Sequence, residues 1–553
     1  MRCGFLCALA ALFALGAHAS ELQVTGGAIR GKALPDGSAV YLGIPYAAPP
    51  VGALRWMPPQ PVFPWNGVRE AMVAPAPCAQ LSEGWNAADA ARSSEDCLYL
   101  SIHVPKHAPG ARLPVLFWIH GGSNRSGSGY GVVDSAIYKS GIIVVGVEYR
   151  LGIFGFLSLP QLTASSPHHS SGNYALLDQI AALEWVHRNI AAFGGDPGRV
   201  TLLGSSAGAV DIGQLLVSPL THGLFARAIQ ESGVPGLPRT LTENERIGSQ
   251  LFAINGLAPG SRGLAALRAL PAAKLLADAT RLRSPDNSFD ALWIAATSDG
   301  WVVPRAFHGF YQPWHGRGRV PLIVGNNTQE FILDDAAAAR RLIRTVFGTN
   351  SRRALPLYGF RDTGPPRVDP VLGGPGTQVL SDLAFRCVSN DEARWTMEAG
   401  KSVWRYQFGV PQPGSHLVEH GGELVYVFGT QPPGASWGSW PPVQRYWINF
   451  IETGNPNGPG LPVWPDLQTR STYMAFTPTG PMPGHDLRRP VCRLMTASYR
   501  NAALRRASSA TASLESQPDE CDIRVNPADV LLCKAARSAD PEAGHTSSAS
   551  PAR

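Results

Sequence analysis

Apolar residues in this chain gather in short continuous runs that are separated by glycine, proline and polar residues. Runs of this length without alternation predict strands that are buried on both faces. One longer segment, 173–190, has a helical period instead, with Leu176, Ile180, Leu183 and Ile190 tending to one side. The predicted strands cover residues 114–119, 142–147, 200–203, 320–324 and 402–408.

The order of these segments includes strand, helix, strand, which is the pattern of a βαβ unit. We therefore expect an α/β fold with a large, mostly parallel central sheet flanked by helices. Residues 21–74 are rich in turns and short β-like runs, whereas 244–279 is rich in alanine and leucine and predicts a helical segment. Residues 447–456 predict a helix that ends at Gly454.

The two ends of the chain differ in composition from the rest. Residues 1–19 combine Arg2, an apolar stretch and the small-residue site Ala17-His18-Ala19, the pattern of a secretory signal peptide. The apolar stretch is too short to cross a bilayer comfortably, so we expect an exported protein without a membrane span. Residues 501–553 are rich in serine, alanine and arginine and predict a disordered tail, which leaves residues 20–500 as the folded domain.

Composition and charge narrow the possible partners. The chain has 553 residues, of which 44% are hydrophobic and 16% charged, enough to bury a large core. The formal net charge of +6 is spread thinly, and no dense run of lysine or arginine occurs. This pattern argues against a nucleic-acid partner.

Export changes the meaning of the cysteines. Cys3 and Cys7 lie in the signal, which leaves six of the eight cysteines, and an even number in an oxidising compartment favours disulfides. None of them has C-x-x-C spacing near histidines, so we expect no zinc site. The simplest pairing closes the loop between Cys78 and Cys97, which the chain-entropy model values at about 3 kcal/mol. The pairing of two tail cysteines stays open: Cys521 and Cys533.

The run 200–203 leads directly into G-S-S-A-G, residues 204–208, centred on Ser206. A G-x-S-x-G motif between a strand and small residues that can open a helix predicts a nucleophile elbow, a sharp turn that lifts the serine hydroxyl above the sheet edge. Gly204 and Gly208 lack the side chains that would clash across such a turn. The alternative is a Gly/Ser-rich loop, which the preceding strand and the F-G-G-D-P lead-in disfavour.

A second glycine motif, H-G-G-S-N at 120–124, follows the predicted strand 114–119. Glycines directly after a strand let backbone N–H groups point into a cleft, where they can stabilise developing negative charge. An ordinary strand-ending turn would be the preferred interpretation without a nucleophile elbow. Because Ser206 follows downstream, we interpret the motif as an oxyanion loop.

A serine hydroxyl needs a general base, and the base needs an orienting carboxylate. In the α/β-hydrolase order of serine, acid and histidine, Glu330 and His420 are candidates. Glu330 follows the predicted strand 320–324, although a glutamate there is also typical of a helix start. Position alone leaves the histidine open, because others also lie downstream of Ser206, among them His308, His315, His416 and His485.

Taken together, the motifs resemble those of type-B carboxylesterases, the family that includes cholinesterases and bacterial carboxylesterases. The resemblance extends from about Glu21 to Arg493. The matching motifs are E-D-C-L-Y-L at 95–100, W-I-H-G-G at 118–122, E-Y-R-L-G at 148–152, G-N-Y-A-L-L-D-Q at 172–179, the segment 193–208, G-N-N-T-Q-E at 325–330 and H-G-G-E-L-V-Y-V-F-G at 420–429.

The resemblance implies an α/β-hydrolase fold and a serine carboxylesterase that acts on a small-molecule ester and needs no metal or organic cofactor. It implies Ser206 as the nucleophile, His420 as general base and then acid, and Glu330 as the orienting carboxylate. The oxyanion donors that it implies are the backbone N–H groups of Gly122, Ser123 and Ala207. Its implied disulfides are Cys78–Cys97 and Cys387–Cys492.

The chain departs from the family pattern at several positions. Ser123 stands where the family usually has a third glycine, and Ser205 where it usually has a glutamate. The second change removes a negative charge beside the nucleophile and predicts a preference for neutral esters. The family's second disulfide, usual near 256–267, has no cysteines here, and the short segment 330–382 predicts a reduced lid. Trp85 could offer an aromatic wall to a cation, but we expect it instead to pack within its own loop.

Two other classes of function share this fold. A non-catalytic adhesion protein would be expected to have lost a member of the triad, and all three candidates are present. An amidase or carbamate hydrolase would use the same machinery, so the sequence leaves this alternative open. It also leaves open the acyl and alcohol preference and the oligomeric state.

Overall fold

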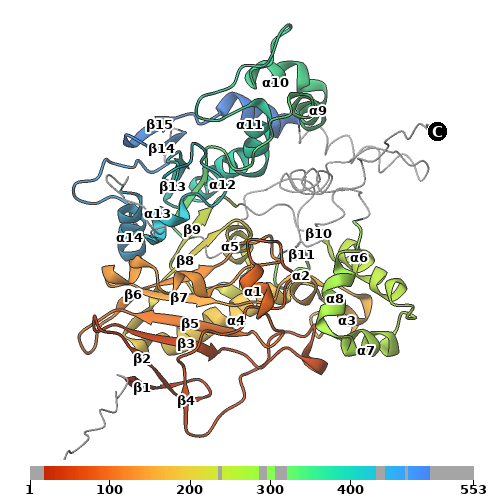
Figure 1. Ribbon diagram of the computed structural model, residues 1–553, viewed down its shortest axis with the longest axis vertical. Helices are drawn as coiled ribbons and strands as arrows, with labels where there is room; N and C mark the ends of the chain where they lie inside the picture. Colours follow the sequence, from red (N-terminus) through yellow and green to blue (C-terminus); the bar gives the residue numbers. More distant parts are fainter. Residues whose placement is uncertain are drawn as a thin grey trace, which may run out of the picture.

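The computed structural model describes residues 18–233, 239–284, 296–304, 320–430, 442–467 and 471–498. Most of the predicted signal peptide and the whole predicted tail, with Cys521 and Cys533, lie outside the described residues. Within them, a single large sheet of thirteen strands crosses the molecule, with helices packed around it (Figure 1).

The strands of this sheet run in the order β1-β2-β3-β5-β7-β6-β8-β9-β12-β13-β14-β15, with β4 beside β2. Neighbours from β7 to β14 are parallel, which confirms the predicted α/β architecture. The pairs at both ends of this order are antiparallel, whereas β4 runs parallel to β2. The bounds are β1 His18–Val24, β2 Gly27–Ala33, β3 Ala39–Pro45, β4 Val68–Glu70, β5 Tyr99–Val104, β6 Leu113–Ile119, β7 Ile143–Val147, β8 Gly195–Ser205, β9 Arg227–Glu231, β12 Leu322–Asn327, β13 Val403–Phe408, β14 Thr472–Thr477 and β15 Gly480–His485; β10 Arg239–Thr240 and β11 Thr297–Ser298 form a separate pair.

The helices lie between and beyond these strands. In chain order they are α1 Ala87–Ala91, α2 Gly152–Phe156, α3 Pro160–Ser165, α4 Tyr174–Asn189, α5 Ala207–Val217, α6 Leu241–Ile254, α7 Ser261–Ala269, α8 Ala272–Ala279, α9 Ala336–Phe347, α10 Ser351–Leu357, α11 Pro375–Ser381, α12 Cys387–Glu398, α13 Leu424–Phe428 and α14 Val443–Thr453.

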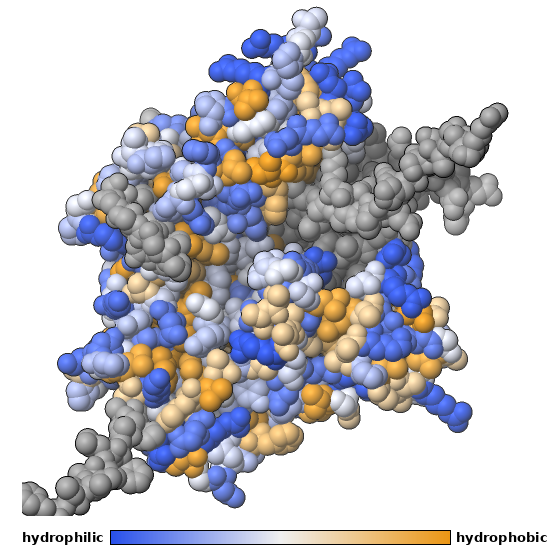
Figure 2. Space-filling view, viewed as in Figure 1, coloured by the Kyte–Doolittle hydropathy of each residue, from blue (hydrophilic) through white to orange (hydrophobic). Residues whose placement is uncertain are grey.

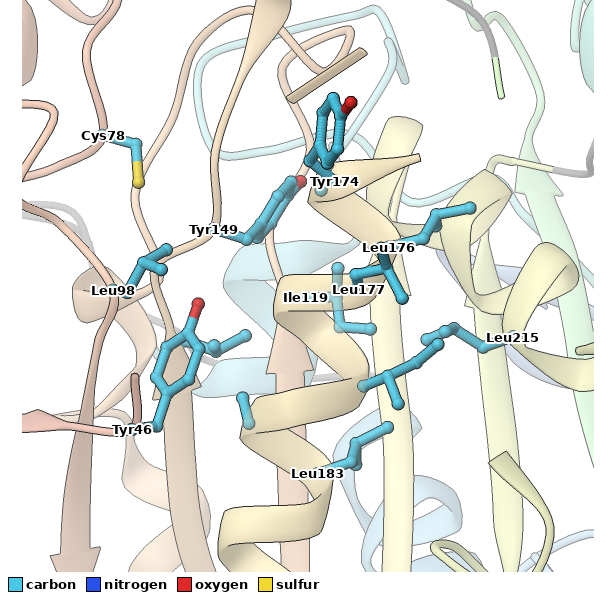
Figure 3. Packing of buried hydrophobic residues seen from close by; sticks show 14 of the residues in the cluster. Tyr46, Cys78, Leu98, Ile119, Tyr149, Tyr174, Leu176, Leu177, Leu183 and Leu215 are labelled. Carbon is cyan, nitrogen blue, oxygen red and sulfur yellow. The ribbon is translucent and has the colours of Figure 1, made fainter. Parts of the chain in front are cut away.

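Alternating side chains of the central strands enter two different cores. In β6, Val115 and Phe117 belong to the larger core, which α4 and α5 complete, as Leu183 and Leu215 in Figure 3 illustrate. Leu116 belongs to the other core, which α14 covers. Successive side chains of a strand point to opposite faces, so both faces of the sheet are buried. This explains why the strand segments read as continuous apolar runs.

Two predicted elements differ from the structure. The segment 244–279 forms three helices, α6 to α8, because Gly256 takes a left-handed conformation (φ 65°) and Pro271 precedes α8. The strand predicted at 320–324 continues to Asn327, so Glu330 follows its end by only three residues.

Two disulfides tie surface segments to the core: Cys78–Cys97 and Cys387–Cys492. The second joins α12 to the segment that follows β15. Among the described residues, no helix is both long enough and apolar enough to cross a membrane.

Candidate active site

Ser206 lies in a strained turn between β8 and α5. Its backbone has φ 57° and ψ −126°, a combination that residues with a side chain rarely adopt. Its N–H donates a hydrogen bond of 2.9 Å to the carbonyl oxygen of Glu231, the last residue of β9. A Cβ at Gly208 would lie 2.1 Å from the carbonyl oxygen of Ile119, so this turn requires glycine there. Such strain is typical of functional positions.

The loop after β6 packs directly against this turn. A Cβ at Gly121 would lie 2.9 Å from the Cβ of Ser206 and 2.7 Å from the carbonyl oxygen of Ser205. Gly122 and Ser123 continue the loop with φ values of 101° and 55°. Ser123, standing where the family has glycine, therefore bears a conformational cost of about 1–2 kcal/mol.

The third predicted oxyanion donor, Ala207, is the first residue of α5. Its N–H belongs to the first turn of the helix and has no intrahelical acceptor. The positive end of the helix dipole also lies there, which favours a negative charge beside Ser206. The loop 120–124 and the first turn of α5, which carry the three predicted donors, therefore both lie beside Ser206.

Glu330 and His420 form a close pair. The Nδ1 atom of His420 lies 2.7 Å from Oε2 of Glu330, and the backbone N–H of His420 donates to the carbonyl oxygen of Glu330 at 3.0 Å. Glu330 is 1% exposed, and its other oxygen, Oε1, accepts from the N–H of Asn327 at 2.6 Å. Because Nδ1 is engaged with the carboxylate, Nε2 is the nitrogen left for proton transfer.

The strand order explains why these residues meet at one edge of the sheet. Ser206 follows β8 directly, Glu330 follows β12 and His420 follows β13, and these strands are parallel members of the run β8-β9-β12-β13. Ligands of open α/β sheets bind outside the carboxyl ends of the strands.

The electrostatic surroundings of His420 favour its charged form. Burial by itself lowers the pKa of His420, but the hydrogen bond and the charge of Glu330 outweigh it, with a smaller contribution from Glu423. The net pKa therefore lies above its ordinary value. The ring also packs between aromatic rings, with centroids 4.9 Å from both Phe331 and Phe385.

Three other histidines of the described residues are less suitable as a base: His120, His416 and His485. His416 and His485 are exposed, whereas His308 and His315 lie outside the described residues. His120 is buried, and burial lowers its pKa to about 4. Its ring stacks on Tyr149 at a centroid distance of 4.4 Å, as expected for a neutral packing residue.

Sequence reasoning missed Ser232, which follows β9. Its hydroxyl donates to Oε1 of Glu330 at 2.7 Å and lies 3.3 Å from Oε1 of Glu423. Its φ of 49° places it in a second strained turn, beside the turn of Ser206. The signal that could have revealed it is a small polar residue directly after a strand, since Ser232 follows the last residue of β9.

Further buried carboxyl groups lie behind the pair. Burial raises the pKa of Glu423 to about 6, and its Oε2 accepts from Nδ2 of Asn327 at 2.5 Å. Burial also raises the pKa of Glu231 well above its usual range, although Trp447 Nε1 donates to it at 2.8 Å. This side of the site therefore contains acids that resist ionisation.

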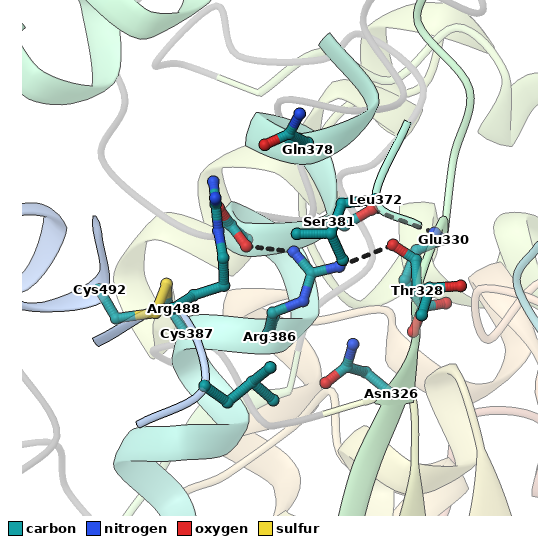
Figure 4. A network of polar contacts seen from close by, with 12 residues as sticks. Asn326, Thr328, Glu330, Leu372, Gln378, Ser381, Arg386, Cys387, Arg488 and Cys492 are labelled. Atoms are coloured by element: carbon teal, nitrogen blue, oxygen red, sulfur yellow. Dashed lines mark hydrogen bonds and ion pairs between the residues drawn. A yellow bond between two sulfur atoms is a disulfide. The ribbon is translucent and has the colours of Figure 1, made fainter. Parts of the chain in front are cut away.

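An arginine network supports the loop that carries Glu330 (Figure 4). Arg386 donates to the carbonyl oxygen of Thr328 at 2.7 Å and forms a buried ion pair with Asp382. Arg488 binds the other oxygen of Asp382 at 2.8 Å. The N–H of Glu330 donates to the hydroxyl of Ser381 at 3.1 Å.

The prediction for Trp85 was wrong. Its side chain is 65% exposed. The interior of its loop is occupied by polar contacts instead, since Asn86 donates to Gln80 at 2.8 Å and Gln80 bonds to both the N–H and the carbonyl of Gly127. The structure thus leaves the indole available at the surface.

Comparisons with known proteins identify the family of this chain. The sequence profile described as "Carboxylesterase family" matches residues 18–347 and 376–494. The chain belongs to the carboxylesterase family. It is a serine carboxylic-ester hydrolase with an α/β-hydrolase fold.

Its relatives include mammalian and bacterial esterases. Liver carboxylesterase 1F of Rattus norvegicus is 32% identical over 536 residues, covering 86% of this chain and 93% of the relative. Fumonisin B1 esterase of Sphingopyxis macrogoltabida is 35% identical over 471 residues, covering 79% of this chain and 83% of the relative. The solved structure of a PNB esterase is 28% identical with a TM-score of 0.70 and covers 86% of this chain and 99% of that one.

Proposed function

We propose that this carboxylesterase hydrolyses esters with Ser206 as nucleophile, His420 as general base and acid, and Glu330 as the orienting carboxylate. The observation that carries the proposal is the 2.7 Å contact between His420 Nδ1 and Glu330 Oε2, at the sheet edge where Ser206 forms its strained turn. A serine hydroxyl becomes a competent nucleophile only when such a base accepts its proton.

The reaction follows from these roles. His420 Nε2 takes the proton of Ser206 as Oγ forms a bond to the ester carbonyl carbon, and the carbonyl oxygen becomes an oxyanion. The N–H groups of Gly122, Ser123 and Ala207 stabilise that charge. The C–O bond to the alcohol then breaks, and the alcohol leaves with the proton from His420. Water, activated by the same histidine, attacks the acyl-enzyme and releases the acid.

The substrate class that we propose is neutral esters. Ser205, the residue before the nucleophile, is buried and carries no charge. A carboxylate there would attract a cationic alcohol group by about 1–4 kcal/mol at a separation of several ångströms. The exposed Trp85 could supply only the weaker cation–π attraction, about 0.5–2 kcal/mol.

We also propose that residues 1–19 direct export, that residues 20–500 form the catalytic domain, and that residues 501–553 are a disordered tail. The two disulfides support export, because disulfides persist in oxidising compartments. The pattern of the first nineteen residues supports a cleaved signal.

A panel of p-nitrophenyl esters with increasing acyl length tests the proposal, with matched anilides to separate esters from amides. Wild type should hydrolyse the esters, while Ser206→Ala should retain the fold but lose about 10⁴-fold or more in kcat. Mass spectrometry should show one organophosphonate adduct on wild type and none on the variant. Stoichiometric labelling of Ser206→Ala would overturn the assignment of the nucleophile.

A further inference from the structure

A buried hydrogen-bond bridge joins the oxyanion loop to the nucleophile helix. Asp211 lies on α5, five residues after Ser206, and is 2% exposed. Its Oδ1 accepts from Nδ2 of Asn124 at 2.9 Å, and its Oδ2 accepts from Nε2 of Gln179 on α4 at 2.7 Å. The roles assigned above use none of these three side chains.

Asn124 directly follows Ser123 and takes a left-handed conformation with φ 54°. Its carbonyl oxygen accepts from the N–H of Gly152 at 2.7 Å. The hydroxyl of Tyr149 donates to the carbonyl oxygen of His120 at 2.6 Å and lies 3.3 Å from Oδ1 of Asn124. The loop is thus anchored on both sides of its two predicted oxyanion donors, and Asp211 supplies the anchor that comes from α5.

We propose that Asn124 and Asp211 are positioning residues, which hold the N–H groups of Gly122 and Ser123 in register with Ser206. The reason lies in the division of the oxyanion hole between two elements. The nucleophile and Ala207 move with α5, whereas the other two donors move with the loop after β6. The Asn124–Asp211 bond is a direct side-chain link between these elements, and a displacement of about 1 Å at such a site costs about 10²-fold in rate.

The hydrogen bond, and not the charge of Asp211, performs this role. Burial raises the pKa of Asp211 to about 7, while the bonds from Asn124 and Gln179 lower it, and both partners are neutral amides. A negative charge behind the oxyanion hole would oppose the oxyanion. Asparagine at 211 keeps the shape and one acceptor oxygen, which serves Nδ2 of Asn124. Its amide nitrogen can donate to Gln179 once that side chain turns its unpartnered Oε1 inward. Leucine keeps only the approximate volume.

The inference rests on the proposed function, and its test is a double-mutant cycle. Asp211→Leu and Asn124→Gly should each lower kcat about tenfold or more with little change in KM, since the donors act on the transition state. Glycine is chosen at 124 because it accepts the left-handed backbone. The double variant should be little worse than either single variant. Asp211→Asn should recover activity to within about threefold of wild type.

Inhibition provides a readout that general destabilisation would not move. A trifluoromethyl ketone forms a tetrahedral oxyanion adduct, so its Ki should rise by the same factor as kcat/KM falls. Asn457→Gly is the matched control, because Asn457 also bridges a loop, donating to the carbonyl of Trp464 at 2.9 Å. Its kcat should match that of wild type.

The outcomes separate this inference from the proposed function. Additive losses in the double variant, or an Asp211→Asn enzyme as impaired as Asp211→Leu, would overturn the positioning role. Full activity of Ser206→Ala would instead overturn the proposed mechanism. If Asp211→Leu fails to fold, the pair of Asn124→Gly and Asp211→Asn still decides, because the inference requires the first to be impaired and the second to be active.

Discussion

His420 bonds to Glu330 twice, through its ring at 2.7 Å and through its backbone N–H at 3.0 Å. The backbone hydrogen bond holds the main chain at His420 against the main chain at Glu330. The side-chain bond fixes the ring within that frame. The orientation of the imidazole therefore depends on two contacts with one residue, which limits the freedom of a side chain that lies twelve residues beyond the end of β13 at Phe408.

Replacement of His420 should be nearly as damaging as replacement of Ser206. His420→Ala removes the proton acceptor, so kcat should fall by about 10⁴-fold. His416→Ala is the control, because His416 lies four residues away and is exposed, and its kcat should stay within about twofold of wild type. Steady-state kinetics on p-nitrophenyl butyrate measures both effects. An inactive His416→Ala enzyme would show that the assignment of His420 as the base is wrong.

The acid limb of the pH profile should report His420. The neutral imidazole is the active form, so kcat/KM should fall as pH falls through its pKa, which lies above the ordinary 6.5. Glu330→Gln removes the largest influence that raises this pKa, so the midpoint of the limb should move to lower pH in the residual activity. A midpoint that is the same in both enzymes would contradict the assigned pair.

Gly121→Ala should impair catalysis although it adds a single methyl group. The new Cβ would lie 2.7 Å from the carbonyl oxygen of Ser205, so the oxyanion loop must move away from Ser206. We expect a loss of about tenfold or more in kcat. Gly131→Ala is matched to it, since a Cβ there meets nothing within 4 Å, and should behave like wild type. Equal kinetics of the two variants would show that the close contact is unimportant.

Charge at position 205 should control the preference for the alcohol group. Wild type should prefer 3,3-dimethylbutyl butyrate over its cationic isostere butyrylcholine in kcat/KM. Ser205→Glu should shift this ratio about fivefold or more toward the cation, because a nearby carboxylate contributes about 1–4 kcal/mol. Ser205→Gln has the same size without the charge and should leave the ratio unchanged. A wild-type preference for butyrylcholine would refute the proposed substrate class.

Both disulfides should form in protein secreted by an oxidising host. Peptide mapping without reduction should recover Cys78 linked to Cys97 and Cys387 linked to Cys492. Replacing Cys387 and Cys492 together by serine should lower the free energy of unfolding by about 2–5 kcal/mol, measured by denaturant titration. Free thiols at these positions would argue against export through an oxidising compartment.

Local features of the site could be predicted because they depend on neighbouring residues. The turn at Ser206 needs small residues at 204 and 208, because its backbone is strained and packs against Ile119. The two glycines therefore make the turn recognisable in the sequence. Gly121 makes the oxyanion loop recognisable in the same way, because a side chain there would clash with the turn of Ser206. Buried parallel strands can also be recognised from neighbouring residues, since both of their faces must be apolar and the strand is a continuous apolar run.

Contacts between distant segments could not be predicted, because they depend on which strands become neighbours. Ser232 meets Glu330 across 98 positions and Asn124 meets Asp211 across 87. Neither pair has a spacing or composition that marks it. The exposure of Trp85 is of the same kind, because its loop is held by hydrogen bonds to another loop, between Gln80 and Gly127, while the indole stays exposed. The sequence alone therefore predicted the types and order of the proposed catalytic residues, whereas the tertiary structure decided which side chains hold them in place.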